Sequence, residues 1–166
     1  MQNRFSTKLS GQIGESLCVA ELGRRGIIAA TFAGNVPDID VLAYRGGISV
    51  PIQVKAQRRG SVSVNATRYL EIAFNGDIQS VEGKISIDRN LIFVFVFMEE
   101  ELGGERFYVC RQGAIQDIIF KHHKSFLTKH DGKRPRNPSS THCSYYEDDL
   151  STYRDNWALI EDALRP

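Results

Sequence analysis

Polar and apolar residues alternate in two neighbouring segments that a Gly-Gly pair connects. Successive side chains of a β-strand point to opposite faces, so Asp38 and Asp40 share one face of the first segment. Gln53 and Lys55 share one face of the second segment in the same way. Because a Gly-Gly pair is typical of a hairpin turn, we expect the two polar faces to lie side by side. Carboxylate, amide and ammonium groups then converge, which predicts a chemical site on this hairpin.

A predicted helix from Thr7 to Arg25 adds a further carboxylate. Glu15 aligns on this helix with apolar residues three, four and seven positions later, on the side that should face the sheet. Burying a carboxylate without a partner is costly. We therefore expect Glu15 to have a partner, either a metal ion or Lys55.

These side chains suit metal-assisted hydrolysis of a phosphodiester bond. Glu15, Asp40 and Gln53, or a nearby backbone carbonyl, offer the hard oxygen ligands that Mg²⁺ or Mn²⁺ accepts. Lys55 can orient or deprotonate an attacking water, or stabilise the charge that develops on the phosphate. A purely structural interpretation stays open, in which Asp38 shapes a turn, Gln53 faces solvent and Lys55 forms a surface salt bridge with Asp40.

The same residues resemble the PD-(D/E)XK nuclease superfamily. Its order of a helical Glu, an Asp on a strand and a (Asp/Glu/Gln)-x-Lys ending is matched by Glu15, Asp40 and Gln53-Val54-Lys55. The Gln-x-Lys ending and the Gly-Gln-Ile-Gly-Glu sequence of the helix are most similar to the Mrr-like and archaeal Holliday-junction-resolvase-like branches. Gln53 stands where the family usually has an acid. Asp40 is favoured over Asp38 as the ligand, because Asp40 lies where the family strand begins.

This resemblance implies an α/β, restriction-endonuclease-like fold with a central mixed sheet flanked by helices. It implies a Mg²⁺- or Mn²⁺-dependent endodeoxyribonuclease whose catalytic residues are Glu15, Asp40, Gln53 and Lys55. The first three of these would hold the metal. The alternatives are a weak or inactive nuclease-fold module that binds nucleic acid, and an unrelated small α/β protein that binds a partner through a basic loop.

A basic segment from Lys121 to Arg136 points to a polyanionic partner. It carries six Lys or Arg against one acid, so it has a charge of +5 while the rest of the chain has about −4. Such local charge favours DNA as the partner, with RNA still open, although a solvated loop would have the same composition. The residues expected to contact nucleic acid are Arg58, Arg59, Lys129, Lys133, Arg134 and Arg136.

Composition and length predict one nuclease-like domain over residues 1–166. A chain with 42% hydrophobic and 25% charged residues can bury a sizeable core. Neither a membrane-spanning segment nor an apolar signal peptide is evident, and the three cysteines form no CxxC pair, so we expect a cytoplasmic protein. Cutting both strands of a duplex would favour a homodimer.

Periodicity predicts the remaining elements. The run 91–98 is apolar at every position, so this strand should be covered on both faces. Further strands are expected at 27–32, 68–74 and 107–110, helices at 113–126 and about 150–164, and an exposed basic loop at about 129–144.

Overall fold

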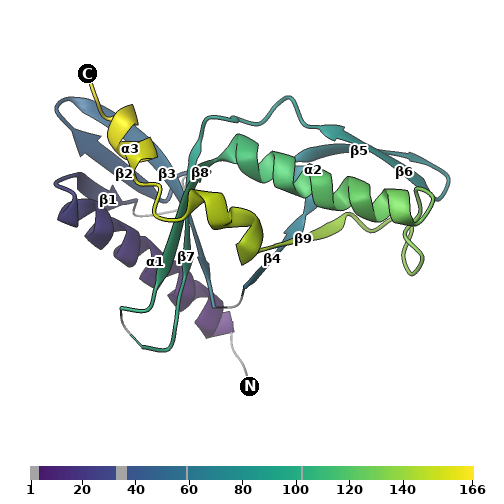
Figure 1. Cartoon of the computed structure of the whole chain (residues 1–166), viewed down its shortest axis with the longest axis horizontal. Coiled ribbons are helices and arrows are strands. Elements are labelled where there is room, and N and C mark those ends of the chain that lie inside the picture. Colours follow the sequence, from purple (N-terminus) through teal and green to yellow (C-terminus); the bar gives the residue numbers. More distant parts are fainter. Residues whose placement is uncertain (1–3, 33–36, 59, 102) are drawn as a thin grey trace.

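The computed structural model describes residues 4–32, 37–58, 60–101 and 103–166. Its centre is a five-stranded sheet in the order β1-β2-β3-β7-β8, which α-helices flank (Figure 1). The β3 and β7 strands are parallel and all other neighbours are antiparallel, so the sheet is mixed. The predicted mixed α/β architecture is confirmed. The five strands are β1 (Ile28–Thr31), β2 (Val41–Arg45), β3 (Ile48–Gln57), β7 (Ile92–Phe97) and β8 (Arg106–Arg111).

The β7 strand separates two hydrophobic cores. Alternation along the strand places Val94 and Val96 in the first core and Phe93, Phe95 and Phe97 in the second. Helices α1 (Arg4–Arg24) and α3 (Ala158–Ala163) contribute to the first core, and α2 (Gln112–Lys129) contributes to the second. All six residues of β7 are buried, as its composition predicts.

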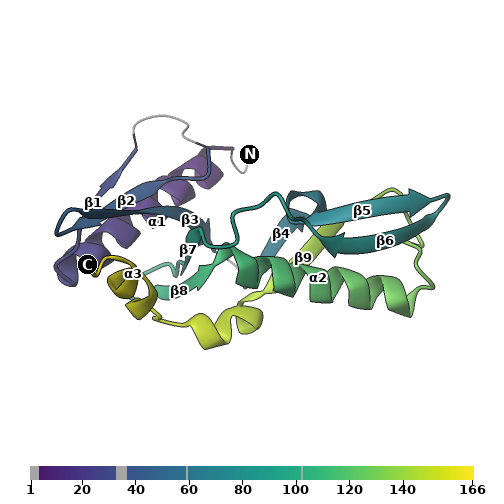
Figure 2. The ribbon, with the colours of Figure 1, turned by 90° about the horizontal axis from the view of Figure 1, so that it is seen from above.

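Two small sheets lie beside α2, away from the central sheet (Figure 2). They pair β4 (Ser61–Asn65) with β9 (His142–Tyr146), and β5 (Leu70–Asn75) with β6 (Ile78–Gly83). The short 3-10 helix η1 (Ala66–Arg68) connects β4 to β5. The chain between β3 and β7 therefore forms β4, η1, β5 and β6 beside the central sheet before it returns to it.

Two expected elements were wrong in part. The loop predicted for 129–144 gives way to β9 at His142, because pairing with β4 satisfies the backbone there. The helix predicted for 150–164 is broken into the 3-10 helix η2 (Glu147–Tyr153) and α3. Asp155 between them has a left-handed backbone (φ 50°), which ends a helix, although the apolar side chains of the stripe still pack inward.

None of the helices within the described ranges combines the length and the apolar composition that crossing a membrane requires.

Candidate active site

Asp40 is held against β3 by three hydrogen bonds. Its backbone N–H donates to the carbonyl oxygen of Ile52 (2.9 Å). Its carboxylate Oδ2 accepts from the backbone N–H of Val54 (2.8 Å) and from the side-chain amide of Gln53. Gln53 is buried, so its amide is not an ordinary solvent-facing group. The hairpin therefore joins Asp40 to the Gln-x-Lys segment, as the alternation predicts, and no ion pair between Asp40 and Lys55 forms within the described residues.

Lys55 lies two residues after Gln53 on β3 and is partly buried. Burial lowers the pKa of Lys55, and the positive charge of Arg68 lowers it further. The negative charges of Asp40, Asp38 and Glu15 oppose this change. Over the described part of the chain, the ammonium group makes neither a hydrogen bond nor an ion pair. Lys55 is thus a partly desolvated amine whose proton is easier to remove than that of a surface lysine.

Helix α1 reaches this region through a close contact at Gly14. A Cβ atom added to Gly14 would lie 2.6 Å from the Cβ atom of Ala56, the residue after Lys55. Only glycine lets the helix backbone approach the strand so closely. Glu15 follows and is half-buried. Burial raises the pKa of Glu15, the charge of Asp40 raises it further, and Lys55 partly offsets both effects.

Three side chains around β3 carry oxygen atoms of the kind that a hard divalent cation accepts. They are the carboxylates of Glu15 and Asp40, which influence each other electrostatically, and the side-chain amide of Gln53. Cys18 lies nearby in the core, but burial, with smaller effects from Asp40 and Glu15, raises the pKa of its thiol to about 12. It therefore supplies no thiolate ligand, and the set is oxygen only. Among the described residues there is no cluster of three or more His, Cys, Asp or Glu side chains suited to a metal ion, so a cation here would depend on Gln53, backbone carbonyls and water.

Gln53 and Lys55 line a pocket of about 480 Å³. Asp38 lines it too, and its backbone is left-handed (φ 63°), which matches its expected role in a turn. Two basic residues that the sequence analysis missed, Arg68 and Lys84, also reach this pocket. They come from η1 and from the residue after β6, and neither belongs to a motif, so no local signal marked them. The other lining residues are Pro37, Ile39, Pro51, Tyr69, Ser86, Ile87, Asp88, Leu91, Phe93 and Gln112.

The basic segment does not join this pocket. The chain between α2 and β9 lies at the end of α2 that points away from the central sheet (Figure 1). Lys129, Lys133 and Arg136 are exposed there. Arg58 follows β3 but lines a different cavity beside several glutamates, and Arg59 lies outside the described residues. The roles of these basic residues in binding stay predictions.

Arg134 differs from its neighbours because its guanidinium group points inward. It donates to Nδ1 of His123 (3.2 Å) and to the carbonyl oxygen of His142. It also lies over the ring of Phe126, 4.9 Å from the ring centre. Internal acceptors therefore bind the guanidinium group of Arg134, which makes it less available to nucleic acid than an exposed arginine.

His123 connects this arginine to the loop that follows α2. Because a guanidinium group only donates, Nδ1 of His123 must accept, and Nε2 then donates to Oε1 of Gln79 (3.1 Å). The Gln79 amide donates in turn to the carbonyl oxygens of Pro138 (2.6 Å) and Ser140 (3.0 Å). Burial, helped by the charge of Arg134, lowers the pKa of His123 to about 4. A neutral histidine thus orders the basic loop.

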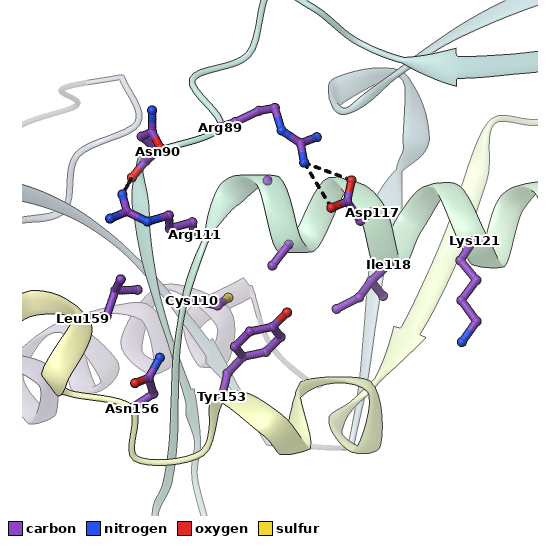
Figure 3. A pocket seen from close by; sticks show the side chains of 12 residues that line it. Arg89, Asn90, Cys110, Arg111, Asp117, Ile118, Lys121, Tyr153, Asn156 and Leu159 are labelled. Atoms are coloured by element: carbon purple, nitrogen blue, oxygen red, sulfur yellow. Dashed lines mark hydrogen bonds and ion pairs between the residues drawn. The ribbon is translucent and has the colours of Figure 1, made fainter.

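A second pocket, of about 600 Å³, lies between β8, α2 and the segment from η2 to α3 (Figure 3). Arg89 there forms an ion pair with Asp117 (3.0 Å), and Arg111 donates to the backbone carbonyl of Asn90 (3.2 Å). Asp117 is the one acidic residue among its lining residues, and it is already paired. This pocket has no counterpart of the Asp40, Gln53 and Lys55 arrangement.

Comparison with family models and with curated proteins finds no match. Among solved structures, the chain is similar to a bacterial homing endonuclease, I-Ssp6803I, with a TM-score of 0.54 and 19% sequence identity. The likeness covers 95% of this chain and 94% of the other. The chain therefore shares the overall fold of that protein. At this level of identity the likeness concerns the fold alone.

Proposed function

We propose that this protein is an endonuclease that hydrolyses phosphodiester bonds in DNA, and that it is a PD-(D/E)XK enzyme with a restriction-endonuclease-like fold. The observation that carries the proposal is the arrangement on β3, where Asp40 is bonded to buried Gln53 and Lys55 lies unpaired beside them. The likeness in fold to an endonuclease supports the same class of activity.

Glu15, Asp40 and Gln53 are the residues that would hold Mg²⁺ or Mn²⁺. When bound, such an ion polarises the phosphate and lowers the pKa of a coordinated water. The Gln53 amide now donates to Asp40, so its carbonyl oxygen is the atom available as a ligand. Asp40 is fixed by the Val54 N–H, which orients its carboxylate before substrate binds.

Lys55 is suited to assist the attack of water on the phosphate. Its lowered pKa makes it a better proton acceptor at neutral pH than a surface lysine. In its protonated form it would stabilise negative charge on the phosphate instead. In either form, removing the ammonium group should reduce the rate of cleavage and not the affinity for the metal.

The neutral Gln53 in place of an acid favours a second candidate, a module of the same fold that binds nucleic acid without cutting it. One experiment distinguishes the endonuclease from the binding module. Supercoiled, single-stranded and branched DNA would each be incubated with purified protein in Mg²⁺, in Mn²⁺ and in EDTA. Cleavage that EDTA abolishes supports the endonuclease, and salt-sensitive binding without cleavage supports the module.

Two variants assign the activity to this site. Removing an outer-shell partner of a metal ligand lowers activity roughly 10- to 100-fold. We expect Asp40→Asn to lower the rate of cleavage by more than this, because Asp40 is a proposed metal ligand. The matched control is Asp77→Asn, which makes the same chemical change at an exposed residue in the turn between β5 and β6. Equal cleavage by Asp40→Asn and the wild-type protein would refute the proposed site.

A further inference from the structure

The pocket beside β3 contains a basic residue that forms no ion pair with an acid among the described residues. Arg68 ends η1, is exposed, and lines the pocket together with Gln53 and Lys55. Throughout the described residues its guanidinium group makes neither a hydrogen bond nor an ion pair. Most other arginines that border a pocket here are engaged, as Arg89 and Arg111 are. An exposed, unpaired guanidinium group in a pocket is suited to an external anion.

The backbone that carries Arg68 is fixed by hydrogen bonds. The Asn65 side chain caps η1 by accepting from the backbone N–H of Thr67 (3.1 Å), and it also accepts from the hydroxyl of Thr141 (2.8 Å). Ala66 donates its N–H to the carbonyl oxygen of Thr141 (2.8 Å), which ties η1 to the residue before β9. Arg68 therefore projects from a well-supported turn, so little backbone ordering would be needed when it binds a ligand.

Lys84 adds a second cation at the same place. Its Nζ donates to the carbonyl oxygen of Thr67 (3.2 Å), one residue before Arg68, and its backbone N–H donates to the carbonyl oxygen of Tyr69 (2.9 Å). A carbonyl partner orients the ammonium group but leaves its charge in place. With Lys55, the pocket thus receives positive charge from three separate segments of the chain.

Two acids also line the pocket, but neither is bonded to these cations. Asp88 accepts from the backbone N–H of Asn90 (2.9 Å), and Asp38 lies in the left-handed turn before β2. The guanidinium group of Arg68 can donate two parallel hydrogen bonds to the oxygens of one phosphate, a geometry that a lysine cannot match.

We propose that Arg68, with Lys84 beside it, binds a phosphate group in the pocket that Gln53 and Lys55 line. The assignment of this phosphate to a nucleic-acid backbone rests on the proposed function. The anion site itself does not depend on that function. Arg68 would then hold the substrate backbone against β3, and the exposed basic segment at the far end of α2 would serve a contact more distant from the reaction.

The test measures binding without metal, so that it is independent of cleavage. Duplex DNA would be titrated in EDTA at several salt concentrations with the wild-type protein, Arg68→Ala, Arg68→Lys and the control Arg24→Ala. Arg24 is exposed at the end of α1, outside this pocket. We expect Arg68→Ala to bind about tenfold more weakly and to reduce the slope of log K against log salt by about 0.9. Arg68→Lys should retain the slope but not the full affinity, and Arg24→Ala should match the wild-type protein.

A second arm uses inorganic phosphate as the probe, followed by the NMR signals of the backbone amides of residues 66–69. Shifts in the wild-type protein that are lost in Arg68→Ala support the site even if DNA does not bind, and the ligand is then a small phosphate compound. An unchanged salt slope and unchanged phosphate shifts in a folded Arg68→Ala protein overturn the inference. Binding that depends on Arg68 without cleavage in Mg²⁺ or Mn²⁺ would reject the proposed activity and leave the phosphate site standing.

Discussion

Basic side chains gather in two regions of the molecule, the pocket around Lys55 and the segment around Arg134, and the arginines Arg68 and Arg134 of these regions differ in their hydrogen bonding. In the pocket, Lys55 and Arg68 have no hydrogen-bond or ion-pair partner among the described residues. In the segment, Arg134 is bonded to His123 and to a backbone carbonyl. An excess of basic residues therefore does not by itself identify a binding surface, because some of these residues bind internal acceptors.

The largest expected effect concerns catalysis in the two regions. If the protein cleaves DNA as proposed, we predict that Lys55→Met lowers the rate of cleavage by about 100-fold or more, because the amine proposed to assist the reaction is removed. Lys133→Ala, which removes the same charge from the exposed segment, should change the rate only through binding. Initial rates at saturating DNA and Mg²⁺ measure both. A larger loss in Lys133→Ala than in Lys55→Met would reverse the assignment of the two regions.

The next effect is the pH dependence that His123 gives to the basic segment. Its pKa is about 4 in the folded protein, below the ordinary 6.5, so the unfolded chain takes up a proton first as the pH falls. Above pH 6.5 His123 is neutral in both states and does not change the free energy of unfolding. As the pH falls from 6.5 toward 4, the free energy of unfolding decreases by about 3 kcal/mol because of this histidine.

Urea denaturation at pH 7, 6, 5 and 4 measures this effect against His123→Gln, which keeps polar groups at the position but does not titrate. Carboxylates contribute equally to both proteins, so the difference between the two curves isolates the histidine. Parallel curves from pH 7 to pH 4 would show that His123 is not the neutral anchor of the loop.

The contact at Gly14 allows a sharper test of how α1 is placed against β3. We expect Gly14→Ala to lower the free energy of unfolding by roughly 1–3 kcal/mol, because the new methyl group meets Ala56. Gly11→Ala lies on the same helix, where no described atom outside the nearby helix backbone is within 4 Å of the added Cβ. It should raise the free energy of unfolding by roughly 0.5–1 kcal/mol. Chemical denaturation compares them, and equal effects would mean that the close approach does not limit the packing.

The smallest effect separates two arginines of the basic segment. Arg134→Ala should lower the free energy of unfolding by about 1–2 kcal/mol and leave the salt dependence of DNA binding unchanged. Arg136→Ala, an exposed neighbour, should change stability by less than about 0.5 kcal/mol. If it contacts a phosphate, it should also reduce the salt slope by about 0.9. Denaturation and binding titrations on both variants check the pair.

The sequence predicted the hairpin site because alternation in a strand decides which face a side chain occupies. That rule placed Asp40, Gln53 and Lys55 together, and helical spacing brought Glu15 to the same region. Loops have no such regular alternation of side chains, so the sequence did not predict that Arg134 points inward. It also could not find Arg68 or β9, because both depend on contacts between segments far apart in the chain.

The buried thiol of Cys18 offers a way to observe α1 in solution. It has no exposed surface and lies in the core one turn after Glu15, and its high pKa keeps it protonated at neutral pH. A thiol reagent can therefore label it only when the helix detaches transiently from the sheet. The rate of labelling would report how often the helix that carries Glu15 opens, and a slower rate on adding Mg²⁺ would indicate that cation binding and helix closure are coupled.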